Sequence, residues 1–211
     1  KSLTQHWDRC IRLSHEPWVW LFSDDDLMSE DCVASLLEGM QKTGEMYDLY
    51  RFNTVMVDAN DHLVAMNPPH PEWETWNQFA YFLLRQLRQT VQQEMIFRRA
   101  SYDRLGGFLD VPLAWASDHA FAIACGQQSG MYTIKTGRIG FRQSGANISS
   151  QRDRATDRLK FQAVLTYVTW LADYIKCRAT CEFPGQAVLG QLVGERFLRS
   201  LRVHIDDIRF G

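Results

Sequence analysis

A chain of 211 residues, of which 45% are hydrophobic and 23% charged, is long enough to bury a core without cross-links. The formal net charge of −2 argues against nucleic acid as a partner. No apolar run reaches the ~18 to 20 residues of a membrane span. Five scattered cysteines favour a reducing compartment over a disulfide framework.

The hydrophobic patterning predicts alternating helices and strands as far as about residue 150. The predicted helices are 3–13, 30–40, 76–87, 101–105 and 117–126. The predicted strands are 18–22, 47–57, 63–66, 93–98, 131–134 and 137–142, of which the second and third form a hairpin. Two long helices, 154–178 and 186–203, are expected to follow.

Three consecutive aspartates, Asp24, Asp25 and Asp26, follow the apolar run at 18–22, which predicts a buried strand. Ligands of open α/β sheets bind beyond the carboxyl ends of strands. Three carboxylates at such an end repel one another and favour a divalent cation. Mg²⁺ and Mn²⁺ prefer hard oxygen ligands and often share them with substrate phosphates.

Two other interpretations of the aspartates are a solvated acidic turn and a helix cap. The cap is better supplied by Ser29, which directly precedes the helix predicted at 30–40. The metal site and the acidic turn therefore both stay open on the local sequence alone.

Four segments stand in a specific order: WVWLFSDDDLMS at 18–29, MIFRRASYDRLGGFLD at 95–110, WASDHAFAIACGQQSGMYTI at 115–134 and FRQSGANIS at 141–149. Together they resemble family 2 glycosyltransferases. The resemblance implies an α/β fold of the GT-A type (nucleotide-diphospho-sugar transferase), with a mixed sheet flanked by helices. It implies a catalytic domain at 1–150 and a C-terminal helical extension at 151–211.

The resemblance implies an inverting, metal-dependent hexosyltransferase that moves a sugar from a nucleotide-sugar donor to a hydroxyl acceptor. It suggests bacterial polysaccharide or surface-glycan synthesis in the cytoplasm or at the inner face of the membrane, with a glycan or lipid-linked acceptor. A peripheral membrane contact and a homodimer are left open. The alternatives are a nucleotidyltransferase on a related sheet and a non-catalytic nucleotide- or sugar-binding module.

In the resembling family a strand-end DxD motif holds Mg²⁺ or Mn²⁺ against the donor diphosphate. Here the motif reads as Asp24 and Asp26, or one step earlier with Ser23 first and Asp25 as the main ligand. Arg138 and Arg142 are expected to reach phosphate oxygens, since guanidinium suits such contacts. A solvated strand face is the alternative for both arginines.

The family places its general base at the start of the helix after a Gly-Gly-Phe turn, usually within a pair of acidic residues. Asp118 matches that base, but Ser117 stands where the acidic partner would be. A base there would take the proton from the acceptor hydroxyl. The alternative role of Asp118 is that of a helix cap.

Four further residues are expected on the acceptor side: Gly106, Gly107, Trp115 and His119. Locally the glycines are equally explained by a helix C-cap, and Trp115 by core packing. Residues 67–73 predict a loop, whose His70, together with Trp73 and Trp76, is a candidate acceptor lid.

The resembling fold has a longer N-terminal half, which binds the nucleotide base and ribose. No matching segment precedes the aspartates in this sequence, so we expect it to be part of a longer chain. The donor base is therefore not predicted.

Overall fold

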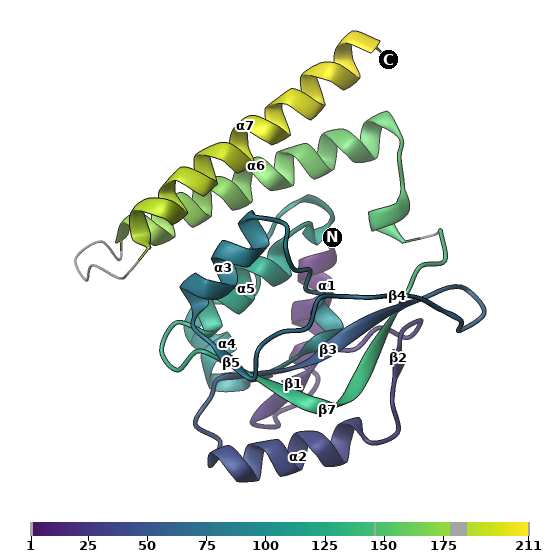
Figure 1. The fold of residues 1–211 in the computed structure, drawn as a ribbon, viewed down its shortest axis with the longest axis vertical. Helices are drawn as coiled ribbons and strands as arrows, with labels where there is room; N and C mark the ends of the chain where they lie inside the picture. The colour runs from purple at the N-terminus through teal and green to yellow at the C-terminus, as the bar shows by residue number, and fades with distance from the viewer. Residues whose placement is uncertain (1, 146, 178–184, 211) are drawn as a thin grey trace.

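The computed structural model describes residues 2–145, 147–177 and 185–210, with the backbone alone for residues 186 and 202–210. A seven-stranded sheet lies at its centre (Figure 1). Helix α2 (Cys32–Thr43) covers one face of the sheet, and the C-terminal helices lie on the other side.

The sheet is mixed, with the strand order β1-β6-β3-β7-β2. Strands β3 and β7 are parallel, and every other pair in the described part of the chain is antiparallel. Strand β4 pairs with β3, and β5 pairs with β7. The strands are β1 (Trp18–Trp20), β2 (Leu27–Met28), β3 (Leu49–Val57), β4 (Leu63–Met66), β5 (Trp73–Glu74), β6 (Met95–Arg98) and β7 (Met131–Arg142).

Strand β3 is the central strand, and its side chains alternate between two hydrophobic clusters. Leu49 points to the cluster that includes the C-terminal helices, whereas Tyr50 and Phe52 point to the cluster under α2. This alternation follows from the two-residue period of a strand. The remaining helices are α1 (Leu3–Ile11), α3 (Trp76–Leu84), α4 (Arg99–Leu105), α5 (Ser117–Cys125), α6 (Arg154–Cys177) and α7 (Gln186–Phe210), with the 3₁₀ turns η1 (Gln92–Glu94), η2 (Pro112–Ala114) and η3 (Ile148–Ser150).

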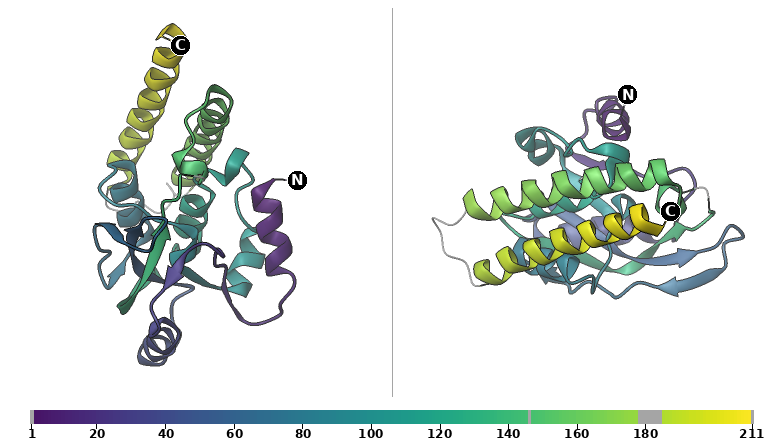
Figure 2. Two further views of the ribbon diagram at one scale, coloured as in Figure 1. Left: turned by 90° about the vertical axis from the view of Figure 1, so that its right-hand side faces the viewer. Right: turned by 90° about the horizontal axis from the view of Figure 1, so that it is seen from above.

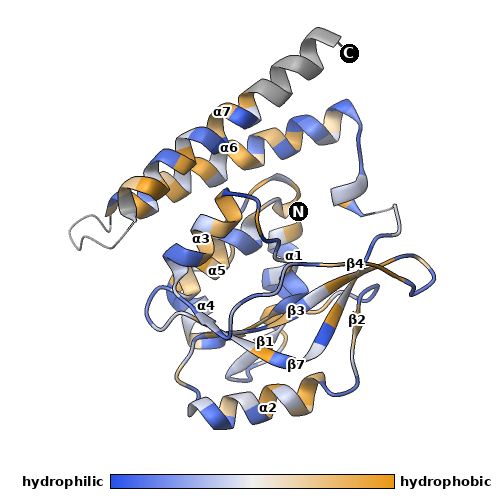
Figure 3. Ribbon diagram, viewed as in Figure 1, coloured by the Kyte–Doolittle hydropathy of each residue, from blue (hydrophilic) through white to orange (hydrophobic). Residues whose placement is uncertain are grey.

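The C-terminal helices α6 and α7 lie side by side over α3 and α5 (Figures 1 and 2). Leu171 of α6 and Leu192 of α7 belong to the same hydrophobic cluster as Leu49 of the sheet. Figure 3 shows hydrophobic and hydrophilic residues alternating along α6 and along the coloured part of α7, as expected of amphipathic helices. In the described ranges no helix has the length and apolar character needed to cross a membrane.

Most predicted elements are confirmed, including the hairpin of β3 and β4 and the two C-terminal helices. The strand predicted at 18–22 is wrong in length, because pairing with β6 stops at Trp20. The strands predicted at 131–134 and 137–142 form one strand, β7, which passes through Gly137 at φ +80°. Arg178, at the end of the helix predicted at 154–178, lies outside the described residues.

The prediction that Ser29 caps the following helix is wrong. Helix α2 begins at Cys32, and Asp31 holds the N-cap position without a side-chain cap bond. The Ser29 hydroxyl instead accepts a hydrogen bond from the Arg138 backbone N–H at 2.9 Å and donates one to Asp31 Oδ1 at 2.6 Å. Ser29 therefore joins this loop to β7, a tertiary contact that a local capping pattern does not contain.

Candidate functional site

The three aspartates lie in the loop between β1 and β2, and they differ in exposure. Asp24 and Asp25 are exposed, whereas Asp26 is 8% exposed. Asp26 Oδ1 accepts a hydrogen bond from the Arg142 backbone N–H at 2.8 Å, and Oδ2 is buried without a partner among the described residues. Burial raises the pKa of Asp26 to about 6, although the hydrogen bond from Arg142 lowers it. The charges of Asp25 and Asp24 add to the rise.

The aspartate loop fits a cation only if the cation also takes ligands from a substrate. In the described part of the chain, no three His, Cys, Asp or Glu side chains converge as a closed metal site. Mg²⁺, however, is often held by one or two carboxylates plus substrate phosphates. The buried, unpartnered Oδ2 of Asp26 and the exposed carboxylates of Asp24 and Asp25 form a negative region that such a cation would stabilise.

Arg142 ties the aspartate loop to the turn between β3 and β4. Its guanidinium donates to the carbonyl oxygens of Asp25 at 2.6 Å and Asp58 at 3.0 Å, and it pairs with the Asp61 carboxylate at 2.5 Å. Arg138 is exposed, and its guanidinium donates to two carbonyl oxygens of its own strand at 2.7 and 2.8 Å. Contact of either guanidinium with phosphate stays a prediction.

Asp118 lies in the first turn of α5, after an unusual stretch of backbone. Leu113, Ala114 and Ala116 have positive φ values of +59°, +50° and +71°, although none is glycine. Such conformations cost about 1–3 kcal/mol each and concentrate at functional sites. Ala116 holds the N-cap position, so Asp118 is not the cap of this helix.

The carboxyl of Asp118 is largely enclosed, with 16% of its side chain exposed. Its Oδ1 accepts a hydrogen bond from the His119 backbone N–H at 2.9 Å and lies 3.9 Å from the His119 ring nitrogen Nε2. Burial raises the pKa of Asp118, His119 lowers it, and the nearby carboxyl of Glu94 raises it. Glu94 is thus a second acidic group beside Asp118, contributed by η1.

The sequence prediction did not single out Glu94. It placed Glu94 inside the strand predicted at 93–98, whereas Glu94 lies in η1, directly before β6. The start of β6 lies beside the end of β1 because the two strands are antiparallel, and this pairing is not visible in the local sequence.

The aspartate loop and Asp118 lie toward the same edge of the sheet. The end of β1 meets the start of β6, where Trp20 Nε1 donates to the Gln93 carbonyl at 2.8 Å and Gln93 Nε2 donates to Ser23 Oγ at 2.7 Å. At the opposite edge, Cys125 at the end of α5 contacts the Asp48 carbonyl at 3.5 Å. The first turn of α5 therefore points back toward the edge that carries the aspartates.

The glycine pair supports a close contact with α1. Gly106 is the left-handed C-cap of α4, as the capping alternative predicts. Gly107 has φ +94°, and a Cβ there would lie 3.2 Å from Asp8 Oδ1.

Trp115 is partly buried, with Lys160 Nζ 4.9 Å from its ring centroid. The acceptor-side roles of the glycine pair, of Trp115 and of His119 stay predictions.

The acceptor lid expected from His70, Trp73 and Trp76 is wrong for two of its three residues. His70 is 3% exposed and Trp76 is 8% exposed, and Trp73 alone of the three is largely open. Trp76 packs edge-on against Tyr174 of α6. The buried ring of His70 has two glutamates, Glu74 and Glu94, as neighbours.

Those glutamates belong to a buried charge cluster formed by Arg51, His70, Glu74, Arg88 and Glu94. His70 Nε2 lies 3.3 Å from Glu94 Oε1, and Arg88 pairs with Glu74 at 2.7 Å. Arg51 also pairs with Glu74. Burial raises the pKa of Glu74, but His70 and the charge of Arg51 outweigh it and hold that pKa at about 2.

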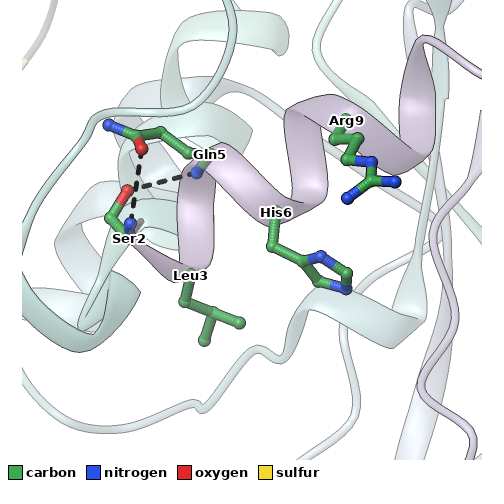
Figure 4. A pocket seen from close by; sticks show the side chains of 5 residues that line it. All are labelled: Ser2, Leu3, Gln5, His6 and Arg9. Atoms are coloured by element: carbon green, nitrogen blue, oxygen red, sulfur yellow. Dashed lines mark hydrogen bonds between the residues drawn. The ribbon is translucent and has the colours of Figure 1, made fainter.

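A surface cavity of about 470 Å³ lies beside α1, away from the predicted site residues. Its lining comes from the start of the helix, where Ser2 and Gln5 form a capping box (Figure 4). The lining residues are Ser2, Leu3, Gln5, His6 and Arg9.

Neither a protein-family model nor a curated protein matches this chain. Among solved structures, the crystal structure of residues 1–349 of TarS from S. aureus is similar, with a TM-score of 0.50 and 11% sequence identity. The similarity covers 99% of this chain and 71% of that one. TarS is a family 2 glycosyltransferase. The mixed sheet flanked by helices in this chain therefore has a GT-A-like glycosyltransferase fold.

Proposed function

We propose that this protein is a glycosyltransferase that moves a sugar from a nucleotide-sugar donor to a hydroxyl acceptor with Mg²⁺ or Mn²⁺. The observation that carries the proposal is the position of Asp24–Asp26 and Asp118 toward one edge of a GT-A-like sheet. The carboxylates of Asp24 and Asp25 are exposed to a cation, and the carboxyl of Asp118 is largely enclosed, which raises its pKa in the direction that a general base needs.

On the donor side, the three aspartates have different roles because they differ in solvent exposure. Asp26 is buried and accepts the Arg142 N–H, so it holds the loop in place. Asp24 and Asp25 are the exposed carboxylates, and the register with Asp24 and Asp26 would need the buried Asp26 as a ligand. This supports the other register, with Ser23 in the first position of the motif and Asp25 as the main metal ligand. A cation bound there would stabilise the negative charge that develops on the departing diphosphate.

On the acceptor side, Asp118 would take the proton from the acceptor hydroxyl as that oxygen attacks the anomeric carbon, with inversion. A base works best when its pKa lies near the working pH. Burial raises the pKa of Asp118 in that direction. We further propose that the acceptor is a glycan or lipid-linked saccharide, used in the cytoplasm or at the inner face of a bacterial membrane.

The proposal is tested by thermal shift with a panel of nucleoside diphosphates, with and without Mn²⁺. A ligand that binds only the folded state raises stability by about 2.7 kcal/mol at a hundredfold excess over its dissociation constant. We expect a Mn²⁺-dependent shift with one nucleoside diphosphate, and we expect Asp25→Ala to abolish it. Glu30→Ala, which removes an exposed carboxylate of the same segment, is the matched control and should keep the shift.

A Mn²⁺-dependent shift that survives Asp25→Ala would remove the aspartate loop as the metal site. The absence of a shift from every nucleoside diphosphate, with a folded protein, would contradict the transferase and favour a non-catalytic binding module. Nucleoside triphosphates are included in the same assay, and a shift from them alone would favour a nucleotidyltransferase.

A further inference from the structure

Helix α6 brings a tyrosine to the candidate base. Tyr167 is 4% exposed, and its ring packs against the His119 ring with a centroid separation of 6.0 Å. His119 is the immediate neighbour of Asp118 on α5. The contact fits the wider packing, since α6 rests on both α5 and η2.

The hydroxyl of Tyr167 is buried and has no hydrogen-bond partner among the described residues. A buried hydroxyl without a partner is unfavourable, so its presence calls for an explanation, and a role at a catalytic site is one. Asp118 has an acceptor oxygen available for such a donor. Its Oδ1 accepts the His119 N–H, and no hydrogen bond to its Oδ2 is found among the described residues.

We propose that Tyr167 is a positioning residue, whose hydroxyl donates a hydrogen bond to the ionised carboxylate of Asp118. This inference rests on the proposed function, in which Asp118 is the general base. Hydrogen bonds at catalytic groups are often long or misaligned in unliganded structures and tighten when the site is used. The C-terminal helical pair would then orient the base as well as complete the core.

The charged and titratable groups around the pair define the expected pH effect. Asp118 faces His119 from α5, Glu94 from η1 and Tyr167 from α6. Burial raises the pKa of Tyr167, and the charge of Arg196 of α7 opposes that rise. Burial and Glu94 raise the pKa of Asp118. A hydrogen bond from a neutral donor favours the ionised form, so Tyr167 would lower that pKa.

The test is Tyr167→Phe, which removes the hydroxyl and keeps the ring. We would follow the Asp118 carboxyl by ¹³C NMR titration of the whole chain, with its signal assigned by Asp118→Asn. The pKa of Asp118 is expected to rise by about one pH unit in Tyr167→Phe. In transfer assays, the acid limb of kcat/KM should move to higher pH by the same amount, because Asp118 must be ionised to act.

Tyr174→Phe is the matched control, because Tyr174 lies two turns further along α6 and packs on Trp76 and Trp170. Its Asp118 titration should match the wild type. An unchanged Asp118 pKa in Tyr167→Phe would overturn the inference, and so would an equal shift in both variants, which would report a loosened helix. The titration needs no activity, so a wild-type protein without transfer would contradict the proposed function and still leave Tyr167 tested.

Discussion

At the scale of single residues, three neighbouring aspartates have three different surroundings. Asp26 faces inward to the Arg142 N–H, whereas Asp24 and Asp25 remain exposed. Like charges and burial together disfavour ionisation of Asp26, which is why its pKa rises to about 6. The loop therefore carries an electrostatic cost that a proton or a cation would relieve.

That cost predicts a pH dependence of stability. The pKa of Asp26 is about 6 in the folded state and 3.8 ordinarily, so the folded state binds the proton more tightly. The stabilisation is therefore fully present below about pH 4 and is lost as pH rises through about 6. At about pH 7 and without metal, Asp26→Asn should stabilise the protein, because it removes a carboxylate whose ionisation is disfavoured by burial. We expect about 1–2 kcal/mol, which is less than the full pKa difference implies, since solvent screens part of the charge.

Urea denaturation of wild type and Asp26→Asn at a series of pH values measures this effect. The difference between the two proteins should shrink as pH falls below about 4, where Asp26 becomes protonated in the unfolded state as well as in the folded state. A constant difference across the series would show that Asp26 does not titrate in this window.

If Asp118 is the general base, its substitution should lower the transfer rate without weakening nucleoside diphosphate binding. Asp118→Asn removes the proton acceptor and keeps the shape, so the transfer rate should fall about 10²–10⁴-fold. Nucleoside diphosphate binding should persist, since Asp118 belongs to the acceptor side of the proposal. Steady-state kinetics on this variant and on Asp103→Asn, an exposed aspartate of α4, measure the effect. Unchanged turnover in Asp118→Asn would exclude Asp118 as the base.

At the scale of elements, strand β7 remains one strand because Gly137 accommodates an irregular position. Gly137 has φ +80°, and a Cβ there would lie 3.0 Å from Cys32 Sγ and 3.2 Å from the Phe52 ring. The register between β3 and β7 shifts at this level, between Phe52 and Thr54. The position of the C-terminal half of β7, which carries Arg142, therefore depends on the backbone conformation of Gly137.

Gly137→Ala should destabilise the protein by about 1–3 kcal/mol, from the left-handed backbone and from the contact with Cys32 and Phe52. Gly44→Ala is the matched control, because Gly44 has φ +60° and a Cβ added there would meet no atom within 4 Å. Chemical denaturation of both variants separates the two causes. An equal loss in both would show that the contact contributes nothing.

At the scale of the whole molecule, a buried charge cluster joins distant elements. Arg51 of β3 pairs with Glu74 of β5, and Glu74 pairs with Arg88 in the segment that follows α3. His70 extends the cluster to Glu94, the group that raises the pKa of Asp118. The cluster therefore joins β3, β5 and η1 through buried side chains.

Removal of one partner from this cluster should be costly. Glu74→Ala leaves Arg51, which is 1% exposed, without its buried carboxylate, and should destabilise the fold by about 3–5 kcal/mol. Glu72→Ala breaks the exposed pair with Lys42 and should change stability little. Thermal unfolding of both variants compares them directly. A small loss in Glu74→Ala would mean that Arg51 reaches water or another carboxylate.

The sequence predicted the glycine C-cap at Gly106 and the boundaries of α5 because both depend on neighbouring residues. It did not predict where β1 ends or the role of Ser29, because these depend on strands that are far away in the chain. His70 was misjudged for the same reason. A histidine in a proline-rich loop resembles a surface residue until the buried glutamates beside it are known.

Local patterns in the sequence were sufficient for most helices, for the longer strands and for the acidic position at Asp24–Asp26, because periodicity involves neighbouring residues. The short strands β2 and β5 were not predicted, and Asp118 was singled out by the family resemblance. The folded arrangement was needed to show which aspartate is buried, what Arg142 binds, and which groups surround Asp118. The Arg142 contact with the Asp25 carbonyl joins residues 117 positions apart, and Tyr167 and Glu94 approach Asp118 from other elements. Such contacts follow from the packing of whole elements, which no local pattern encodes.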